Sequence, residues 1–142
     1  QAGHRPRGSD PCAGCLVLFL GVAVEAGDVQ RGDTIGAGTP KTIDAMLRAV
    51  LNEVPPTHLA GHYHDTQARA LDNIQVSLDH GLRVFDAAVG GLGGCPYAPG
   101  AKGNVATEAM NDLLLSLGFE TGLDTAQLKA AANFAKGLRN DT

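Results

Sequence analysis

The sequence contains no tryptophan, and two tyrosines and four phenylalanines are its only large aromatic side chains. Basic residues are also few, because eleven Lys and Arg stand against fifteen Asp and Glu, for a formal net charge of -4. Since Lys and Arg are scattered along the chain, no basic patch offers nucleic acid a binding surface. Apolar residues make up 44% of the 142 residues, which indicates a globular chain with one core.

Long apolar runs are absent as well. No run approaches the roughly 20 residues that cross a bilayer, so we expect no association with a membrane. The most apolar stretch, 15–24, follows Arg5 and Arg7. A basic flank followed by a short apolar core is also the pattern of a signal peptide. We interpret this stretch as a buried strand or a short helix.

Cysteine is scarce, and the count of three is odd. A disulfide framework is therefore disfavoured, and we expect reduced thiols and a cytoplasmic location. Cys12 and Cys15 form a single CxxC, which can be read as a redox pair or as half of a zinc site.

From Asp28 onward, turn residues divide the chain at regular intervals. Thr39 and Pro40 are typical of a helix start, and Asp124 with Gln127 is typical of another. The predicted strands cover about 26–30, 57–64 and 82–89, with a stub at 119–122. The predicted helices cover about 40–54, 66–80 and 106–117, with a last one after Asp124. This alternation predicts an α/β fold with a parallel sheet, whose chemistry lies at the carboxyl ends of the strands.

Polar side chains gather at those strand ends. His62 and His64 are two residues apart, so both imidazoles face the same side of a strand and can bind one metal ion. Asp65 follows them and can hold a ring nitrogen by a hydrogen bond. The alternative is a pair of ordinary histidines near a turn.

Two further polar residues have a structural and a functional interpretation. Asp33 lies between glycines after the first predicted strand, where a carboxylate serves either a turn or a reaction. Asn104 precedes a predicted helix, where it is either the N-cap or an oxygen ligand for a hard divalent ion.

Four glycines surround Cys95 in the stretch 89–97. The thiol can act as an acid or a base if its surroundings tune its pKa. A phosphate-binding loop is the rival interpretation, but no Lys-Ser/Thr pair follows, and Pro96 removes one N–H donor. A flexible surface loop with an incidental cysteine is the third.

Taken together and in order, these elements resemble the 3-hydroxy-3-methylglutaryl-CoA lyase family from about residue 28 to 140. The most specific segments are GLGGCPYA at 91–98 and GNVATE at 103–108. The wider superfamily, which includes isopropylmalate and homocitrate synthases, shares the His-x-His but not the cysteine loop.

This resemblance implies a TIM barrel, (β/α)8, that cleaves 3-hydroxy-3-methylglutaryl-CoA to acetyl-CoA and acetoacetate with Mg²⁺ or Mn²⁺. It implies metal binding by His62, His64 and Asn104, and catalysis by Cys95, His62 and Asp33. The substrate loop would contain Gly91, Gly93 and Gly94.

The chain departs from the family in its first part. The family's first barrel strand supplies an Arg and a metal-binding Asp, and residues 1–27 match neither. We therefore expect an atypical lead at 1–27 and the C-terminal half of a barrel at 28–142. Because a half-barrel has unpaired strand edges, we expect a homodimer or a complementary half-barrel as partner, with an acyl-CoA thioester as substrate. A catalytically incompetent fragment is the alternative.

Overall fold

The computed structural model describes residues 29–33, 36–92 and 102–140 of the chain. In these ranges three parallel strands form one sheet in the order β1 (Val29–Asp33), β2 (Leu59–Tyr63) and β3 (Val84–Phe85). The register pairs Asp33 with Tyr63, so β1 and β2 end side by side. This parallel sheet confirms the predicted α/β class.

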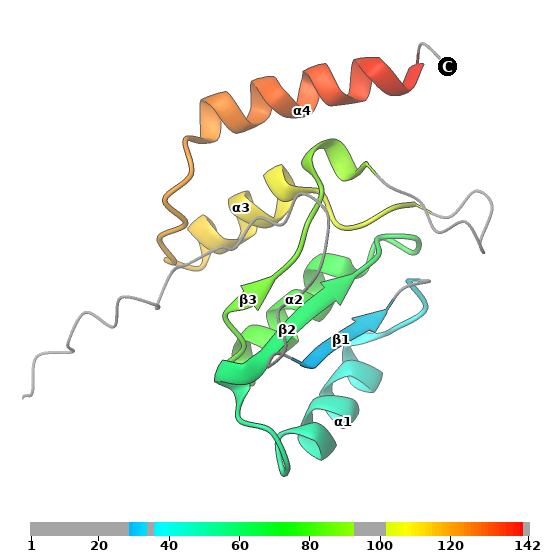
Figure 1. Ribbon diagram of the computed structural model, residues 1–142, viewed down its shortest axis with the longest axis vertical. Helices are drawn as coiled ribbons and strands as arrows, with labels where there is room; N and C mark the ends of the chain where they lie inside the picture. Colours follow the sequence, from blue (N-terminus) through cyan, green and yellow to red (C-terminus); the bar gives the residue numbers. More distant parts are fainter. Residues whose placement is uncertain (1–28, 34–35, 93–101, 141–142) are drawn as a thin grey trace, which may run out of the picture.

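In the part of the chain that the structure describes, four α-helices accompany the sheet (Figure 1). The first two, α1 (Pro40–Val50) and α2 (Ala70–Asp79), follow β1 and β2, and α3 (Thr107–Ser116) and α4 (Thr125–Asn140) follow β3. Figure 1 shows α1 and α4 at opposite ends of this part of the molecule. A short 3-10 turn, Pro56–His58, leads into β2.

Two helix starts are confirmed by their capping contacts. Thr39 is the N-cap of α1 and forms a capping box with Thr42, and Pro40 is the first helical residue. Asp124 Oδ1 accepts the N–H groups of Ala126 and Gln127 at the start of α4. In both places a short polar side chain satisfies N–H groups that would otherwise have no partner inside the helix.

The other boundaries differ from prediction. α2 starts at Ala70 instead of 66, because Ala68 has a φ of 55° and the Asp65 carboxylate accepts the Ala70 N–H at 3.2 Å. β3 covers only two of the eight predicted residues, and 119–122 forms no strand. α1 ends at Val50, before the predicted 54. At the start of α2, a local polar contact and a positive φ therefore shorten the helix relative to what apolar periodicity indicates.

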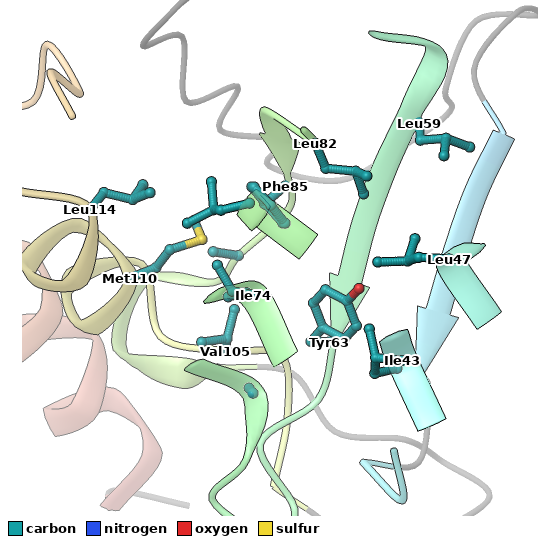
Figure 2. Packing of buried hydrophobic residues seen from close by; sticks show 13 residues of the cluster. Ile43, Leu47, Leu59, Tyr63, Ile74, Leu82, Phe85, Val105, Met110 and Leu114 are labelled. Carbon is teal, nitrogen blue, oxygen red and sulfur yellow. The ribbon is translucent and has the colours of Figure 1, made fainter. Parts of the chain in front are cut away.

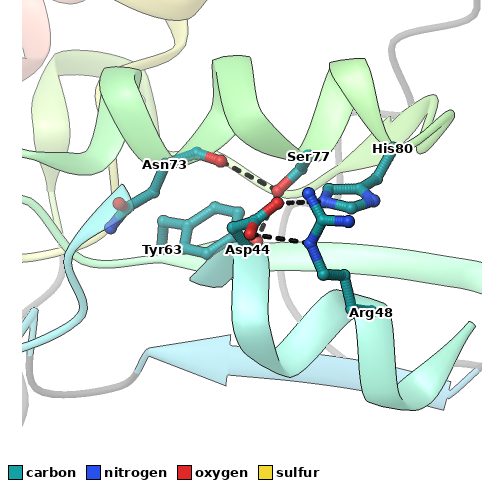
Figure 3. A network of polar contacts seen from close by, with 6 residues as sticks. All are labelled: Asp44, Arg48, Tyr63, Asn73, Ser77 and His80. Carbon is teal, nitrogen blue, oxygen red and sulfur yellow. Dashed lines mark hydrogen bonds and ion pairs between the residues drawn. The ribbon is translucent and has the colours of Figure 1, made fainter. Parts of the chain in front are cut away.

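The apolar core lies between the sheet and its helices. Leu59 and Tyr63 of β2 are buried with Leu47 of α1 and Ile74 of α2 (Figure 2). The Tyr63 hydroxyl donates to Ser77 Oγ at 2.6 Å, and Ser77 Oγ donates to the Asn73 carbonyl (Figure 3). Burial raises the pKa of Tyr63, so its hydroxyl remains protonated. This face of β2 is therefore closed by packed side chains.

The alternate residues of β2 behave differently. Ala60 and His62 are only partly buried, since successive side chains on a strand point to opposite faces. The sheet thus has one closed, helix-covered face and one open face that carries His62.

The outermost helix, α4, turns part of its apolar surface outward. Ala132 and Ala135 are buried, whereas the side chains of Phe134 and Leu138 are 71% and 56% exposed. No helix in the described ranges is long and apolar enough to cross a membrane. Two large apolar side chains of α4 therefore face the solvent.

Candidate active site

Two histidines lie together where β2 ends. The ring centroids of His62 and His64 are 5.0 Å apart with an interplanar angle of 61°. The backbone N–H of His64 donates to the Asp33 carbonyl at 3.2 Å, which ties this turn to the end of β1. The two-residue spacing therefore does place both rings on one side, as predicted.

Asn104 comes to the same place from a distant segment. It forms an isolated antiparallel bridge with His64, and the Val105 N–H donates to the Tyr63 carbonyl at 2.9 Å. The N-cap position of α3 is Ala106, so the interpretation of Asn104 as a helix cap is wrong. The structure thus brings together all three predicted metal ligands.

A fourth residue, Asp86, joins them and was not among the predicted site residues. It follows β3, and its backbone N–H donates to the Gly61 carbonyl at 3.1 Å. Its carboxylate contacts His62 Nδ1 at 2.7 and 2.9 Å and accepts from Asn104 Nδ2 at 2.8 Å. Asp86 therefore takes the role predicted for Asp65, whose carboxylate is used to start α2.

These contacts shift the pKa values of Asp86 and His64. Burial raises the pKa of Asp86, but hydrogen bonds from His62 and Asn104 outweigh it and hold the pKa below its usual value. Burial, together with the neighbouring His62, lowers the pKa of His64. At neutral pH the site therefore combines an ionised carboxylate with a neutral His64 ring.

The chemistry of these donors fits a divalent ion. The Nδ1 atom of His64 is buried without a hydrogen-bond partner among the described residues, a costly state that a ligand would relieve. Asn104 Oδ1 accepts from the Val105 N–H and keeps a second lone pair. The described ranges hold no cluster of three His, Cys, Asp or Glu side chains suited to a metal. The candidate ligands are therefore two imidazoles and one amide, and water or substrate oxygens would complete the coordination of the ion.

Asp33 ends β1 with both carboxylate oxygens engaged. Oδ1 accepts the Ala37 N–H at 2.9 Å, and Oδ2 accepts the Gly38 N–H at 2.7 Å. These contacts are those of a turn-forming aspartate. The Asp33 charge nevertheless partly opposes the lowering of the His64 pKa, so Asp33 belongs to the electrostatic surroundings of the cluster.

A cavity of about 240 Å³ lies beside the cluster. Its lining residues are Asp65, Gly90, Gly91, Lys102, Asn104 and Ala106. Of the predicted loop glycines, Gly91 is therefore at the cavity, whereas Gly93, Gly94 and Cys95 lie outside the described residues. Cys12 and Cys15 lie outside them as well.

The wall formed by Gly90 is held by two helices. Gly90 has a φ of 71°, and its N–H donates to Glu108 Oε2 of α3 at 3.0 Å. Lys136 of α4 forms an ion pair with Glu108 at 2.8 Å. An added Cβ at Gly90 would lie 3.3 Å from the Ala132 carbonyl oxygen, which is a tight contact. α4 therefore helps to fix one side of the cavity.

Comparison with known proteins gives one consistent family. The family model described as HMGL-like matches residues 16–135. The cytoplasmic 3-hydroxy-3-methylglutaryl-CoA lyase of Rattus norvegicus is 49% identical over 115 residues, which cover 81% of this chain and 34% of the relative. A mitochondrial hydroxymethylglutaryl-CoA lyase of Arabidopsis thaliana is 50% identical over 107 residues, or 75% of this chain and 23% of the relative. The chain thus spans about a third of the length of the first relative and about a quarter of the length of the second.

Solved structures agree with the sequence relatives. An HMG-CoA lyase from Brucella melitensis superposes with a TM-score of 0.76 at 63% identity, covering 80% of this chain and 40% of that structure. An HMG-CoA lyase from Acinetobacter baumannii, in complex with coenzyme A and 3-methylmalate, has a TM-score of 0.73 at 35% identity and covers 79% and 37%.

Proposed function

We propose, since the chain belongs to the HMGL-like family, that it carries the C-terminal, metal-binding half of a 3-hydroxy-3-methylglutaryl-CoA lyase barrel. The observation that carries this proposal is the cluster of His62, His64 and Asn104 at the carboxyl end of β2. In (β/α)8 barrels the residues that perform the reaction lie at this end of the strands. The partial coverage of the relatives supports the half-barrel, for which we propose the range 28–142.

The proposed reaction breaks the bond between the hydroxyl-bearing carbon of the substrate and the carbon next to its thioester. Loss of the hydroxyl proton turns that carbon into the ketone of acetoacetate, and the bonding electrons remain on the other carbon as the enolate of acetyl-CoA. The enolate then takes a proton on carbon. A divalent ion, Mg²⁺ or Mn²⁺, would polarise the hydroxyl and stabilise the developing negative charge.

Residues of this chain have separate roles in that scheme. His62, His64 and Asn104 would hold the ion, and Lys102 at the cavity suits a substrate that carries a carboxylate and phosphates. Asp33, His62 and Cys95 are the proposed groups for removal and delivery of the proton. Gly91, Gly93 and Gly94 would let the segment that contains Cys95 come close to the thioester.

The chain alone is proposed to be inactive. The exposed Phe134 and Leu138 of α4 support this view, because a closed barrel would cover such a surface with its other half. The partner is then a complementary half-barrel, with a homodimer as the alternative. The structure of an HMG-CoA lyase with bound coenzyme A supports an acyl-CoA thioester as substrate.

An acetoacetate assay with the CoA thioester and Mg²⁺ or Mn²⁺ tests the proposal. It compares the chain alone with the chain mixed with the N-terminal half of the Brucella melitensis lyase. We expect activity only in the mixture, and we expect His62→Ala and Cys95→Ala to abolish it while His80→Ala keeps it. Activity of the chain alone would contradict the half-barrel, and a folded but inactive mixture would contradict the assigned reaction.

A further inference from the structure

Asp86 connects three segments of the site through one carboxylate. The carboxylate follows β3, contacts His62 of β2, and accepts from the Asn104 side chain on the segment before α3. Its side chain is 20% exposed, so these contacts are shielded from most of the solvent. The Asp86 N–H bond to the Gly61 carbonyl fixes its backbone to β2 as well. The carboxylate is therefore held at a defined place.

The chemistry of a carboxylate fixes the state of both neighbours. An ionised carboxylate only accepts hydrogen bonds, so His62 Nδ1, which lies 2.7 Å from Asp86 Oδ1, must carry a hydrogen. The lone pair of the neutral ring then lies on Nε2. In the same way the Asn104 NH₂ group must point to Asp86, which turns Oδ1 away from the carboxylate.

We infer that Asp86 is a positioning residue, which presents His62 Nε2 and Asn104 Oδ1 to a divalent ion and supplies negative charge beside otherwise uncharged ligands. The inference rests on the proposed function, because the ion is part of that proposal. A carboxylate behind a ligating imidazole fixes the ring and raises its basicity, and loss of such a partner weakens metal affinity about 10–100-fold.

The chain contains its own matched control. His80 and Asp44 form a second histidine–aspartate contact at 2.8 Å, through His80 Nε2, on the helix side of the sheet (Figure 3). The two histidine side chains are almost equally exposed, at 18% for His62 and 17% for His80. Changes at Asp44 therefore remove a similar contact far from the cluster of His62 and Asn104.

The first test needs no metal. Nitrogen-15 NMR of the metal-free chain, recorded at alkaline pH, reports which ring nitrogen of His62 carries the hydrogen. We expect Nδ1–H in the natural chain and a shift toward Nε2–H in Asp86→Ala. Asp86→Asn should keep Nδ1–H, because its amide oxygen still accepts. The finding of Nε2–H at His62 in the natural chain would overturn the inference.

The second test measures Mn²⁺ affinity of the same chains by electron paramagnetic resonance. We expect about 10–100-fold weaker binding in Asp86→Ala, an intermediate loss in Asp86→Asn, and a change of less than about twofold in Asp44→Ala. Unchanged affinity in Asp86→Ala would overturn the inference.

The two tests separate the inference from the proposed function. If the natural chain binds no Mn²⁺, the proposed metal site of this chain fails, and the His62 tautomer alone decides the role of Asp86. If Asp86→Ala does not fold, Asp86→Asn supplies the comparison, since it keeps the size of the side chain and one acceptor oxygen while it removes the charge.

Discussion

The two histidine–aspartate pairs among the described residues have similar distances but different surroundings. His80 and Asp44 join α2 to α1, and Arg48 shares the Asp44 carboxylate at 2.9 Å (Figure 3). His62 and Asp86 join two strand ends, and an amide and a second imidazole lie beside them. The first pair fastens two helices over a closed core. The second leaves a ring nitrogen available on the open face, so the surroundings and not the pair itself indicate a function.

Removal of each histidine in turn gives the largest expected contrast. His62→Ala removes a proposed ligand and should weaken Mn²⁺ binding by about 100-fold or more, which exceeds the effect typical of a supporting residue. His80→Ala should change the affinity by less than about twofold, because it lies outside the cluster. Isothermal titration of both variants with Mn²⁺ checks this, and equal losses would remove the distinction between the pairs.

A substitution on the closed, helix-covered face of the sheet should change the stability of the fold and leave metal binding unchanged. Tyr63→Phe removes the buried hydrogen bond to Ser77 and should lower the free energy of unfolding by about 1 kcal/mol. Mn²⁺ affinity should stay unchanged, because the Tyr63 ring faces the helices while His62 faces the open side. Urea unfolding and a metal titration of this variant measure both quantities. A weakened metal site with unchanged stability would contradict the division into two faces.

Low pH should destabilise the cavity wall and the contact between α1 and α2 through different carboxylates, Glu108 and Asp44. Burial raises the pKa of Glu108, but its contacts with Lys136 and the Gly90 N–H leave the pKa below its usual value. Hydrogen bonds from Arg48 and His80 lower the pKa of Asp44. A carboxylate with a lowered folded-state pKa stabilises the fold at neutral pH, and this contribution is lost as the pH falls through that pKa.

In Glu108→Gln and Asp44→Asn, the free energy of unfolding measured between pH 7 and pH 3 should therefore depend less on pH than in the natural chain. We expect the larger change for Glu108→Gln, because the Glu108 side chain is 12% exposed and that of Asp44 is 38% exposed. An Asp44→Asn curve that flattens more than the Glu108→Gln curve would show that exposure does not rank these contacts.

The smallest expected effect is that of Arg48. It shares Asp44 with His80, but its side chain is 71% exposed, and surface ion pairs of this kind contribute little. Arg48→Met should leave both Mn²⁺ affinity and the unfolding midpoint nearly unchanged. A clear fall in the midpoint would show that Asp44 needs both partners to join the two helices.

Local signals in the sequence were enough for some parts of the fold. Thr39 with Pro40 and Asp124 with Gln127 satisfy helix N–H groups within a few residues, so the pattern alone located both starts. The His-x-His spacing likewise determined that both rings share a face, once β2 was recognised.

Contacts between residues far apart in the sequence could not be predicted from such local patterns. Asp86 meets His62 across neighbouring strands, and the only local signal was an acidic residue within a predicted strand of a parallel sheet. On α4 the large Phe134 side chain is exposed, whereas the small Ala132 and Ala135 are buried, because Gly90 approaches the helix closely. The roles of Asp33 and Cys95 in the reaction stay predictions.

Paramagnetic broadening by Mn²⁺ is the most direct test of a metal site at the strand ends, because it compares both histidine–aspartate pairs in one unmodified chain. Sub-stoichiometric Mn²⁺ is added while the NMR signals of the histidine rings and the Asn104 side chain are recorded. We expect the signals of His62, His64 and Asn104 to broaden first, and that of His80 to be unaffected at the same concentration. Equal broadening of His80, or broadening that spares His62 and His64, would contradict a metal site at the ends of the strands.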